Sequence, residues 1–213
     1  YFARLSLVLS QGRQENGWLI LEPTTSLWLH YTNVSGGKSL WDIANDFQAL
    51  LGALERGQME YDLGCEDIMA DCGSVGRKCL RVGQTRYHTV VLPAKTENLE
   101  SRTFQLMRDF ASSGGRIIAL GLPDYVDGEE SAELQAFMQS DAVIKMQTPQ
   151  EILSLYRQET DLLVQCPENS HVYHYRCRYE DGQLLFLTNS SLTDETPVTV
   201  SMPGKYLYRL DAM

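Results

Sequence analysis

The clearest pattern of hydrophobic and polar positions runs over residues 89–121 and predicts a strand, a helix and a second strand. The apolar run 90–92 stops at Pro93, which is typical of a parallel strand covered on both faces. A second apolar run follows at 117–120. Between the two runs, apolar or neutral residues recur at helical spacing, at Leu99, Thr103, Leu106, Met107, Phe110 and Ala111. Two such strands with a covering helix predict a right-handed crossover in a parallel sheet.

The two ends of this central helix carry their own signals. Asn98 precedes the helical pattern and is a favoured N-cap residue. Gly114 and Gly115 follow the pattern and suit the left-handed conformation at a helix C-terminus. We therefore expect the helix to begin directly after Asn98 and to end at the glycine pair.

Similar patterns place further elements before and after this segment. Apolar runs or alternation predict strands at 18–21, 59–63 and 143–146. Helical periodicity with start and stop signals predicts helices at 1–12, 39–57, 65–72, 131–139 and 149–158. Irregular segments are expected after the first strand, including a polar connection at 33–37, and a small hairpin is expected at 78–87.

The pattern changes near Thr160. No helical period remains beyond it, and short strands are predicted at 162–166, 172–179, 184–188, 197–202 and 206–210, with a hairpin turn at Asp181 and Gly182. Strands that alternate with helices, followed by strands alone, predict a flavodoxin-like or related doubly wound parallel α/β domain over 16–158. A helical lead-in occupies 1–15, and a small all-β segment, the start of a β-sandwich, occupies 159–213.

Charge narrows the range of partners. The 213 residues carry 18 Lys and Arg against 28 Asp and Glu, which gives a formal net charge of −10. No cluster of Lys and Arg occurs, so neither nucleic acid nor an anionic membrane is expected as a partner. No apolar stretch approaches the length needed to span a membrane.

The cysteines bear on redox state and location. They are Cys65, Cys72, Cys79, Cys166 and Cys177. Their odd number and wide spread do not fit a disulfide framework, and no zinc-ligand spacing occurs, so we expect reduced thiols and no metal. Reduced thiols favour the cytoplasm. The sequence begins without Met and inside a helical pattern, so we interpret it as a piece of a longer protein, in which an upstream signal peptide would permit export.

Candidate chemistry lies at the carboxyl ends of the strands, where doubly wound folds bind their ligands. These ends are expected at 22–26, 64–67, 93–98 and 121–125. The hydroxyls of Thr24, Thr25 and Ser26 weakly resemble a flavin phosphate loop, but no glycine gives a phosphate close access to the backbone. Capping of a loop or helix is the more ordinary role for such hydroxyls.

Nucleophilic and acid–base chemistry find little support in the sequence. The turn at 119–123 contains no Cys, Ser or Thr, one of which an amidotransferase-type nucleophile would require. Cys65 stands beside Glu66, without a histidine near it in the sequence. The four histidines and the carboxylate pairs form no recognisable triad or acid pair, so no catalytic residue is assigned.

Four segments occur in a characteristic order: YFARLSLVLSQG, WLILEPTTSLWLHY, FQALLGALERGQMEYDLGCEDIM and RYHTVVLPAKTENLESRTFQLMRDFASSGGRIIALG. In this order they resemble the region that follows the catalytic barrel in large bacterial glycoside hydrolases of the α-L-rhamnosidase type and their relatives. The β-galactosidase trimerisation domain, itself amidotransferase-like, is similar in architecture. The resemblance implies that the α/β domain is of the class I glutamine amidotransferase-like kind.

The tail HVYHYRCRYEDGQLLFLTNSS resembles the stretch that opens the β-sandwich of those enzymes. The matching positions are His174, Arg176, Asp181, Gly182, Phe186 and Asn189, although Tyr175 separates a histidine and an arginine that are adjacent in the family. The catalytic carboxylates of the family lie on the barrel, which this sequence does not contain. The resemblance therefore carries over no catalytic residue.

Residues and resemblance together predict a non-catalytic accessory domain that supports the barrel, the substrate entrance or oligomer contacts. The expected partners are the barrel of the same chain, carbohydrate and a second copy of the chain, and no cofactor is expected. The ligand-side loop candidates are Glu22, Thr24, Thr25, Ser26, Trp28, His30, Tyr31 and Glu66. The aromatic faces of Trp28 and Tyr31 would stack on a sugar or pack at a domain interface.

Two alternatives stay open from the sequence. The first is an independent domain that binds flavin or nucleotide through Thr24, Thr25 and Ser26. The second is a thiol hydrolase that uses Cys65.

Overall fold

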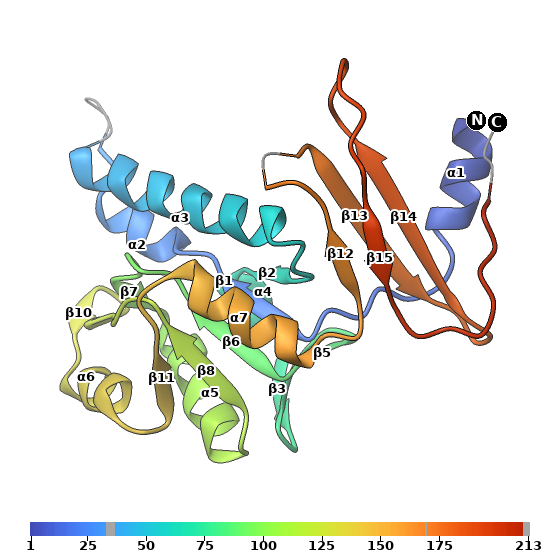
Figure 1. Cartoon of the computed structure of the whole chain (residues 1–213). Helices are drawn as coiled ribbons and strands as arrows, with labels where there is room; N and C mark the ends of the chain where they lie inside the picture. Colours follow the sequence, from blue (N-terminus) through green and yellow to red (C-terminus); the bar gives the residue numbers. More distant parts are fainter. Residues whose placement is uncertain (33–36, 169, 211–213) are drawn as a thin grey trace. The chain divides into compact units, whose positions relative to one another are not determined.

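The structure is a computed structural model that describes residues 1–32, 37–168 and 170–210. Most of the polar connection expected at 33–37 therefore lies outside the described residues. The chain divides into two compact units (Figure 1). We call Asn16–Leu54 with Glu60–Leu153 the α/β unit, and Tyr1–Glu15 with Glu55–Met59 and Ser154–Met213 the β-rich unit.

Five parallel strands form the centre of the α/β unit, in the order β11-β8-β6-β1-β2. They are β1 (Trp18–Leu21), β2 (Asp62–Gly64), β6 (Thr89–Leu92), β8 (Arg116–Ala119) and β11 (Val143–Lys145). Every residue of β1 and β6 is buried, as expected for central strands covered on both faces. A mixed α/β class with a parallel sheet is thereby confirmed.

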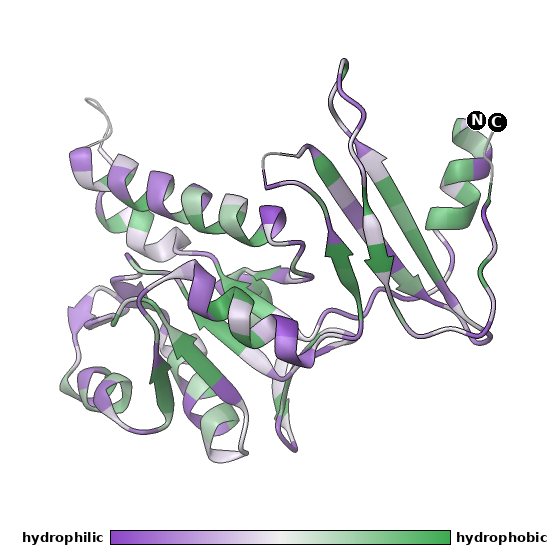
Figure 2. Ribbon diagram, viewed as in Figure 1, coloured by the Kyte–Doolittle hydropathy of each residue, from purple (hydrophilic) through white to green (hydrophobic). Residues whose placement is uncertain are grey.

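Helices cover one face of this sheet with a continuous apolar core. They are α4 (Glu66–Cys72), α5 (Ser101–Ser112) and α6 (Ala132–Gln139). Alternate residues of the strands share a buried cluster with the apolar sides of these helices, including Leu19, Leu21, Val90, Leu92, Ile117, Ala119, Met69, Met107, Phe110 and Leu134. Figure 2 shows the same division, with hydrophobic strands and helices striped by hydrophilic residues.

Two further helices are α3 (Lys38–Arg56) and α7 (Pro149–Glu159); in the view of Figure 1, α7 passes in front of the sheet and α3 runs above it. Each begins in the α/β unit and ends in the β-rich unit. Within the α/β unit they contribute the buried residues Ile43, Leu50, Leu54, Ile152 and Leu153. The sheet is thus covered on both faces, which fits the all-buried pattern of its central strands.

Two small sheets complete the α/β unit. The first joins β3 (Gly73–Gly76), β4 (Cys79–Val82) and β5 (Thr85–Tyr87) in antiparallel order. The second joins β10 (Glu129–Glu130), β9 (Tyr125–Val126) and β7 (Asn98–Leu99). The hairpin expected at 78–87 is confirmed and gains a third strand.

The segment at 89–121 follows the predicted strand, helix and strand, with β6 and β8 paired in parallel. Its helix starts later than expected, because Asn98 belongs to β7 and Glu100 takes the N-cap position of α5. The prediction of Asn98 as the N-cap is therefore wrong. The expected left-handed glycine is confirmed at Gly114, which has a φ of 88°.

Two other boundaries differ from the sequence-based expectation. Residues Thr24–Leu29 form a helix, α2, where an irregular loop was expected after β1. Pro23 stands at its N-cap position, so the polar residues that follow form a first helical turn. The second strand of the sheet begins at Asp62 and is shorter than the predicted 59–63.

Besides the ends of α3 and α7, the β-rich unit contains one complete helix and four strands among its described residues. They are α1 (Phe2–Leu9), β12 (Leu163–Gln165), β13 (Val172–Arg178), β14 (Gln183–Asn189) and β15 (Thr199–Ser201). β13 and β14 form an antiparallel hairpin, and the predicted turn at Asp181–Gly182 is confirmed by the bond from Tyr179 N–H to Gly182 O. The strand expected at 206–210 is wrong, because those residues form no strand and their large side chains are exposed.

Candidate functional site

The candidate site lies where β1, β2 and β6 end at the same edge of the parallel sheet. Leu21 pairs with Gly64, and Ile20 pairs with Val91, so the segments after these strands start side by side. Helix α2 follows β1, helix α4 follows β2, and the segment 93–100 follows β6. The structure therefore brings together residues that the sequence separates by about seventy positions.

Ser26 fastens the start of α2 to the segment after β6. Its side chain is fully buried, and its Oγ accepts hydrogen bonds from the backbone N–H of Glu97 at 2.9 Å and of Asn98 at 3.1 Å. The N–H groups of a buried connecting segment need such partners, because leaving them unpaired costs free energy. Ser26 thus holds backbone of its own chain, and its oxygen acts as an acceptor, whereas a hydroxyl that binds a phosphate would act as a donor.

Glu66 links all three segments through its carboxylate. The residue is buried, with only 4% of its surface exposed. Its Oε1 accepts a hydrogen bond from Thr25 Oγ1 at 2.7 Å, and its Oε2 accepts one from the backbone N–H of Glu100 at 2.8 Å. A carboxylate is tolerated at such depth when hydrogen bonds replace the water it has lost. The position at the start of α4 adds a favourable interaction with the helix dipole.

Asn98 extends the network to the turn between β9 and β10. Its backbone carbonyl accepts a hydrogen bond from Thr25 Oγ1 at 3.3 Å, and its side-chain Oδ1 accepts one from the backbone N–H of Gly128 at 2.8 Å. Asp127, beside this glycine, accepts a hydrogen bond from the N–H of Ser101 at 2.8 Å. The first turn of α5 is therefore capped by a residue 26 positions further along the chain.

The density of carboxylates at this edge affects Glu100. Burial raises the pKa of the Glu100 carboxyl above its ordinary value, and repulsion from Glu66, Asp67 and Asp127 raises it further. The cluster is an electrostatic cost of the network.

Beyond the buried network, three candidates face solvent. Trp28 and Tyr31 are exposed, and His30 is half-buried. His30 Nε2 lies 2.7 Å from Glu97 Oε2. Glu97 was not among the candidates from the sequence, which offered no signal that His30 would meet a residue 67 positions away.

The remaining candidates are placed less distinctively. Glu22 is partly exposed, and its backbone N–H bonds to Gly64 O at 3.0 Å. Thr24 is partly exposed at the first position of α2. Cys65 is the N-cap residue of α4, and its thiol makes no capping bond. Among the described residues, no hydrogen bond joins this thiol to a histidine.

The turn after β8, at 119–123, is filled by backbone. A Cβ built on Gly121 would lie 1.8 Å from the carbonyl oxygen of Ala94. The residue at the centre of the turn must therefore be glycine, since any side chain would collide with the segment after β6. The turn at 119–123, which is the turn expected to match an amidotransferase nucleophile turn, therefore has no room for a side chain at its centre.

A shallow hollow lies beside the network and is lined by Val126, Asp127, Glu129, Glu130 and Ser131. Its lining is mainly acidic. Within residues 1–32, 37–168 and 170–210, no group of three or more His, Cys, Asp or Glu side chains is placed to hold a metal ion. The helices of the same described segments are also too short or too polar to cross a membrane.

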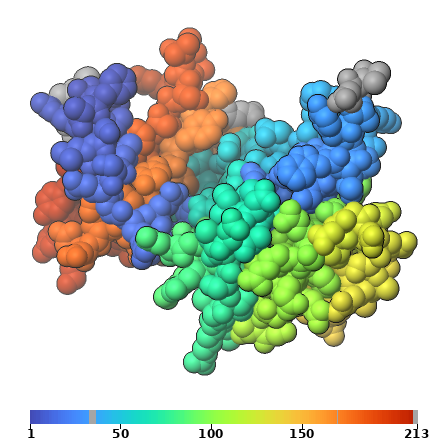
Figure 3. All heavy atoms as spheres, turned by 180° about the vertical axis from the view of Figure 1, so that it is seen from behind, coloured from blue at the N-terminus to red at the C-terminus, as the bar shows by residue number. Residues whose placement is uncertain are grey.

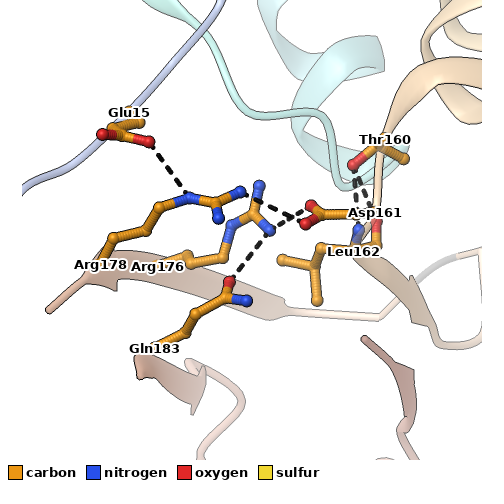
Figure 4. A network of polar contacts seen from close by, with 7 residues as sticks. All are labelled: Glu15, Thr160, Asp161, Leu162, Arg176, Arg178 and Gln183. Atoms are coloured by element: carbon orange, nitrogen blue, oxygen red, sulfur yellow. Dashed lines mark hydrogen bonds and ion pairs between the residues drawn. The ribbon is translucent and has the colours of Figure 1, made fainter. Parts of the chain in front are cut away.

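A second polar cluster lies in the β-rich unit (Figure 4). Arg176 Nη1 lies 2.5 Å from Asp161 Oδ1, and Arg178 bonds to the other Asp161 oxygen at 3.3 Å and to Glu15 at 3.2 Å. The hydrogen bond from Arg176 holds the pKa of the Asp161 carboxyl below its ordinary value, despite partial burial. Arg176, one of the residues that carry the family resemblance, is thus part of a structural ion pair.

His174, another residue of that resemblance, is likewise engaged within the unit. Its Nδ1 lies 2.8 Å from Gln58 Oε1, and Gln58 Nε2 donates to the carbonyl of Val172 at 2.9 Å. Two of the six residues of that resemblance, His174 and Arg176, therefore make contacts that fasten β13 to neighbouring segments.

Comparison with known proteins gives a likeness among solved structures. No family model matches the sequence, and no curated protein matches it. Among solved structures, a rhamnosidase from Novosphingobium sp. PP1Y is similar, with a TM-score of 0.54 and 16% sequence identity. The similar region covers 89% of this chain and 18% of the rhamnosidase chain. At this identity the likeness shows a shared fold, and the chain spans less than a fifth of the length of that protein.

Proposed function

We propose that this chain is a non-catalytic accessory part of a glycoside hydrolase and that its α/β unit is a flavodoxin-like domain. The observation that carries the proposal is the likeness of 89% of the chain to 18% of a rhamnosidase. The ordered series of sequence segments points independently to the same enzymes. Numbered along the chain, the five parallel strands follow the order 2-1-3-4-5, which flavodoxin-like domains have.

The absence of catalysis is supported by what the strand-end groups already do. Ser26 and Glu66 bond to backbone N–H groups, and Thr25 bonds to Glu66. A general acid or base must have its carboxyl within reach of a substrate, whereas Glu66 is buried with both oxygens engaged. Gly121 fills the place where an amidotransferase-like domain would carry its nucleophile.

The same contacts weigh against the two alternatives. A flavin or nucleotide phosphate would compete for the hydroxyls of Thr25 and Ser26 with bonds that hold α2 in place. A thiol hydrolase would need a base beside Cys65, and none bonds to it among the described residues. Neither alternative gains an observation of its own.

The role we propose for the domain is to support a catalytic barrel of the same polypeptide, the substrate entrance or contacts between subunits. The side of the sheet where strand ends gather presents Trp28 and Tyr31 to solvent. Large exposed aromatic side chains grouped in this way mark a contact surface for a ligand or a partner.

Hydrolysis of an aryl-glycoside panel, headed by an aryl α-L-rhamnoside, tests this proposal. The 213-residue chain and the longest natural protein that contains it are assayed in parallel. We expect turnover by the longer protein alone. In that protein, Cys65→Ala and Glu66→Gln are expected to retain kcat within about threefold, since neither residue touches substrate. Turnover by the 213-residue chain alone would reject the proposal.

A further inference from the structure

Helix α2 is built differently at its two ends. Its first turn carries the buried residues Thr25 and Ser26, both bonded within the protein. Its last turn and the residues after it carry Trp28 and Tyr31, which are 62% and 68% exposed. In Figure 3 the blue segment that includes α2 lies open on the face shown, beside the yellow-green region of β9 and β10. One short helix thus joins a fixed base to two solvent-facing aromatic rings.

The fixed base makes this surface pre-organised. Hydrogen bonds join the side chains of Thr25 and Ser26 to Glu66 and to the backbone of residues after β6. At the other end, a Cβ built on Gly128 would lie 3.7 Å from Leu29 Cδ2, so α2 also approaches the turn between β9 and β10. A helix that is held in place before a ligand arrives loses less backbone entropy on binding, so the positions of Trp28 and Tyr31 in the chain are fixed in advance.

A polar group with spare hydrogen-bonding capacity stands beside the rings. His30 lies between Trp28 and Tyr31 in the sequence, and its Nε2 contacts Glu97 Oε2 at 2.7 Å. The Glu97 carboxylate is partly exposed, and a carboxylate accepts about four hydrogen bonds. It can therefore accept hydrogen bonds from the hydroxyls of a ligand while it stays in contact with His30.

Charge restricts the ligand further. The neighbouring hollow is lined by Asp127, Glu129 and Glu130, and the chain as a whole has a formal charge of −10. Such a surface repels phosphates, sulfated glycans and uronates. A neutral sugar is not repelled by the acidic surface. Its hydroxyls donate hydrogen bonds to carboxylates, and its C–H faces stack on aromatic rings.

We infer that the surface formed by Trp28, His30, Tyr31 and Glu97 binds a neutral oligosaccharide. This inference rests on the proposed glycoside hydrolase context for the class of ligand, and it adds a site and residue roles to it. Trp28 and Tyr31 supply stacking faces, Glu97 accepts sugar hydroxyls, and His30 positions Glu97. The surface feeds or holds substrate for a reaction that takes place elsewhere.

Tryptophan fluorescence gives a direct test on the 213-residue chain. Of its three tryptophans, Trp18 is 2% exposed, while Trp28 and Trp41 are 62% and 59% exposed. In a Trp41→Phe background, acrylamide therefore quenches chiefly Trp28. The chain is titrated with neutral gluco-, galacto-, xylo- and rhamno-oligosaccharides, and with oligogalacturonate as the anionic counterpart. We expect a neutral oligosaccharide to protect Trp28 from quenching and oligogalacturonate to have no effect.

Variants identify the surface. In the same background, Tyr31→Ala should weaken binding at least about fivefold through the loss of a stacking face. Glu97→Gln should weaken it about threefold, since an amide offers fewer acceptor sites. Tyr206→Ala is the matched control, because Tyr206 is an exposed tyrosine of the β-rich unit, and it should leave the affinity unchanged.

Three results would overturn the inference. They are no protection by any neutral oligosaccharide at millimolar concentration, protection only by oligogalacturonate, and binding that Tyr31→Ala leaves intact. Trp28 could also become protected when the chain is concentrated, with no effect of sugar. That result would assign the surface to contact with a second copy of the chain and would also reject the inference. The hydrolysis assays distinguish failure of this inference from failure of the proposed function. If the longer protein turns over an aryl glycoside but no sugar binds to the surface around Trp28, the inference alone is rejected.

Discussion

Strands β1 and β6 of the α/β unit are buried along their whole length, whereas β13 and β14 of the β-rich unit are mostly half-buried or exposed. The α/β strands contribute to one continuous apolar cluster that also includes Phe110 and Met107 of α5. In the β-rich hairpin, Val172 and Cys177 are the buried residues, and α1 has none. Apolar burial is therefore the main source of stability in the first unit and a weaker one in the second.

The polar groups described above are also more deeply buried in the α/β unit than most of the ion-paired groups of the β-rich unit. Glu66 and Ser26 of the α/β unit are buried and bonded to backbone N–H groups. Asp161, Arg178 and Glu15 of the β-rich unit form ion pairs that remain partly exposed to water. Losing one partner of a buried pair costs more than losing an exposed one, because water cannot replace it. Equivalent substitutions should thus cost more in the α/β unit.

The largest effect is expected from Phe110→Ala. Phe110 is fully buried in α5, and its ring fills the space beside Gly115, where a Cβ would lie 2.0 Å away. Truncation should lower the free energy of unfolding by about 3–5 kcal/mol in urea denaturation, through lost transfer energy and the cavity left behind. Tyr173→Ala on the partly exposed face of β13 is the control and should cost less than about 1 kcal/mol. Equal costs would remove the contrast between the units.

The next largest effect is expected from Glu66→Ala. The substitution leaves the N–H of Glu100 without its acceptor and leaves the hydroxyl of Thr25 with only the longer contact to the Asn98 carbonyl, at 3.3 Å, so it should cost about 2–3 kcal/mol. Amide hydrogen exchange should show lost protection at Glu100 and in the first turn of α5. Asp67→Ala controls for the helix dipole, since Asp67 is the next residue of the same first turn and is exposed. A similar loss in both variants would indicate that the dipole, and not the network, stabilises this edge.

Local periodicity was enough to predict the central part of the fold. The strand, helix and strand at 89–121 and the turn at Asp181–Gly182 depend on residues close in sequence, and both are confirmed. The α/β class follows from the same local signals. The N-cap of α5 was not predictable, because Asn98 is drawn into β7 by pairing with a strand that starts 27 residues later.

The candidate site shows a similar limit. The sequence placed Thr25, Ser26 and Glu66 at strand ends, and the structure has them there. The sequence did not indicate that these residues bond to one another and to the backbone. Glu97 and Asn98 were missed as members of the network, because their partners lie 67 to 73 residues away. The strand expected at 206–210 failed for a related reason, since alternation of apolar residues favours a strand only where a partner strand pairs with it.

A smaller effect is expected from Asp161→Asn in the β-rich unit. The variant weakens the pairing of Arg176 and Arg178. It should cost about 1 kcal/mol, because Asp161 and Arg178 are partly hydrated and because the amide oxygen of the substituted side chain can still accept a hydrogen bond from Arg176, whose side chain is only 9% exposed. The folded-state pKa of Asp161 is lowered, so its contribution is present above the unfolded pKa of about 3.9 and is lost as pH falls through the folded value. Urea denaturation at pH 7 and below pH 4 should therefore show the difference from wild type shrinking on acidification. A difference that is constant with pH would mean that the cost is steric.

The smallest effect, and one of opposite sign, is expected from Glu100→Gln in the α/β unit. The raised pKa of Glu100 means that its charge is disfavoured in the folded state, so stability falls as pH rises from the unfolded pKa of about 4.3 through the folded value. The substitution removes that charge and keeps the N–H that bonds to Glu66, so the variant should be slightly more stable than wild type at pH 7 and equal to it below pH 4. Thermal denaturation at both pH values measures this. Destabilisation at pH 7 would show that Glu100 makes a favourable contact, and would place its carboxylate among the stabilising groups of this edge together with Glu66.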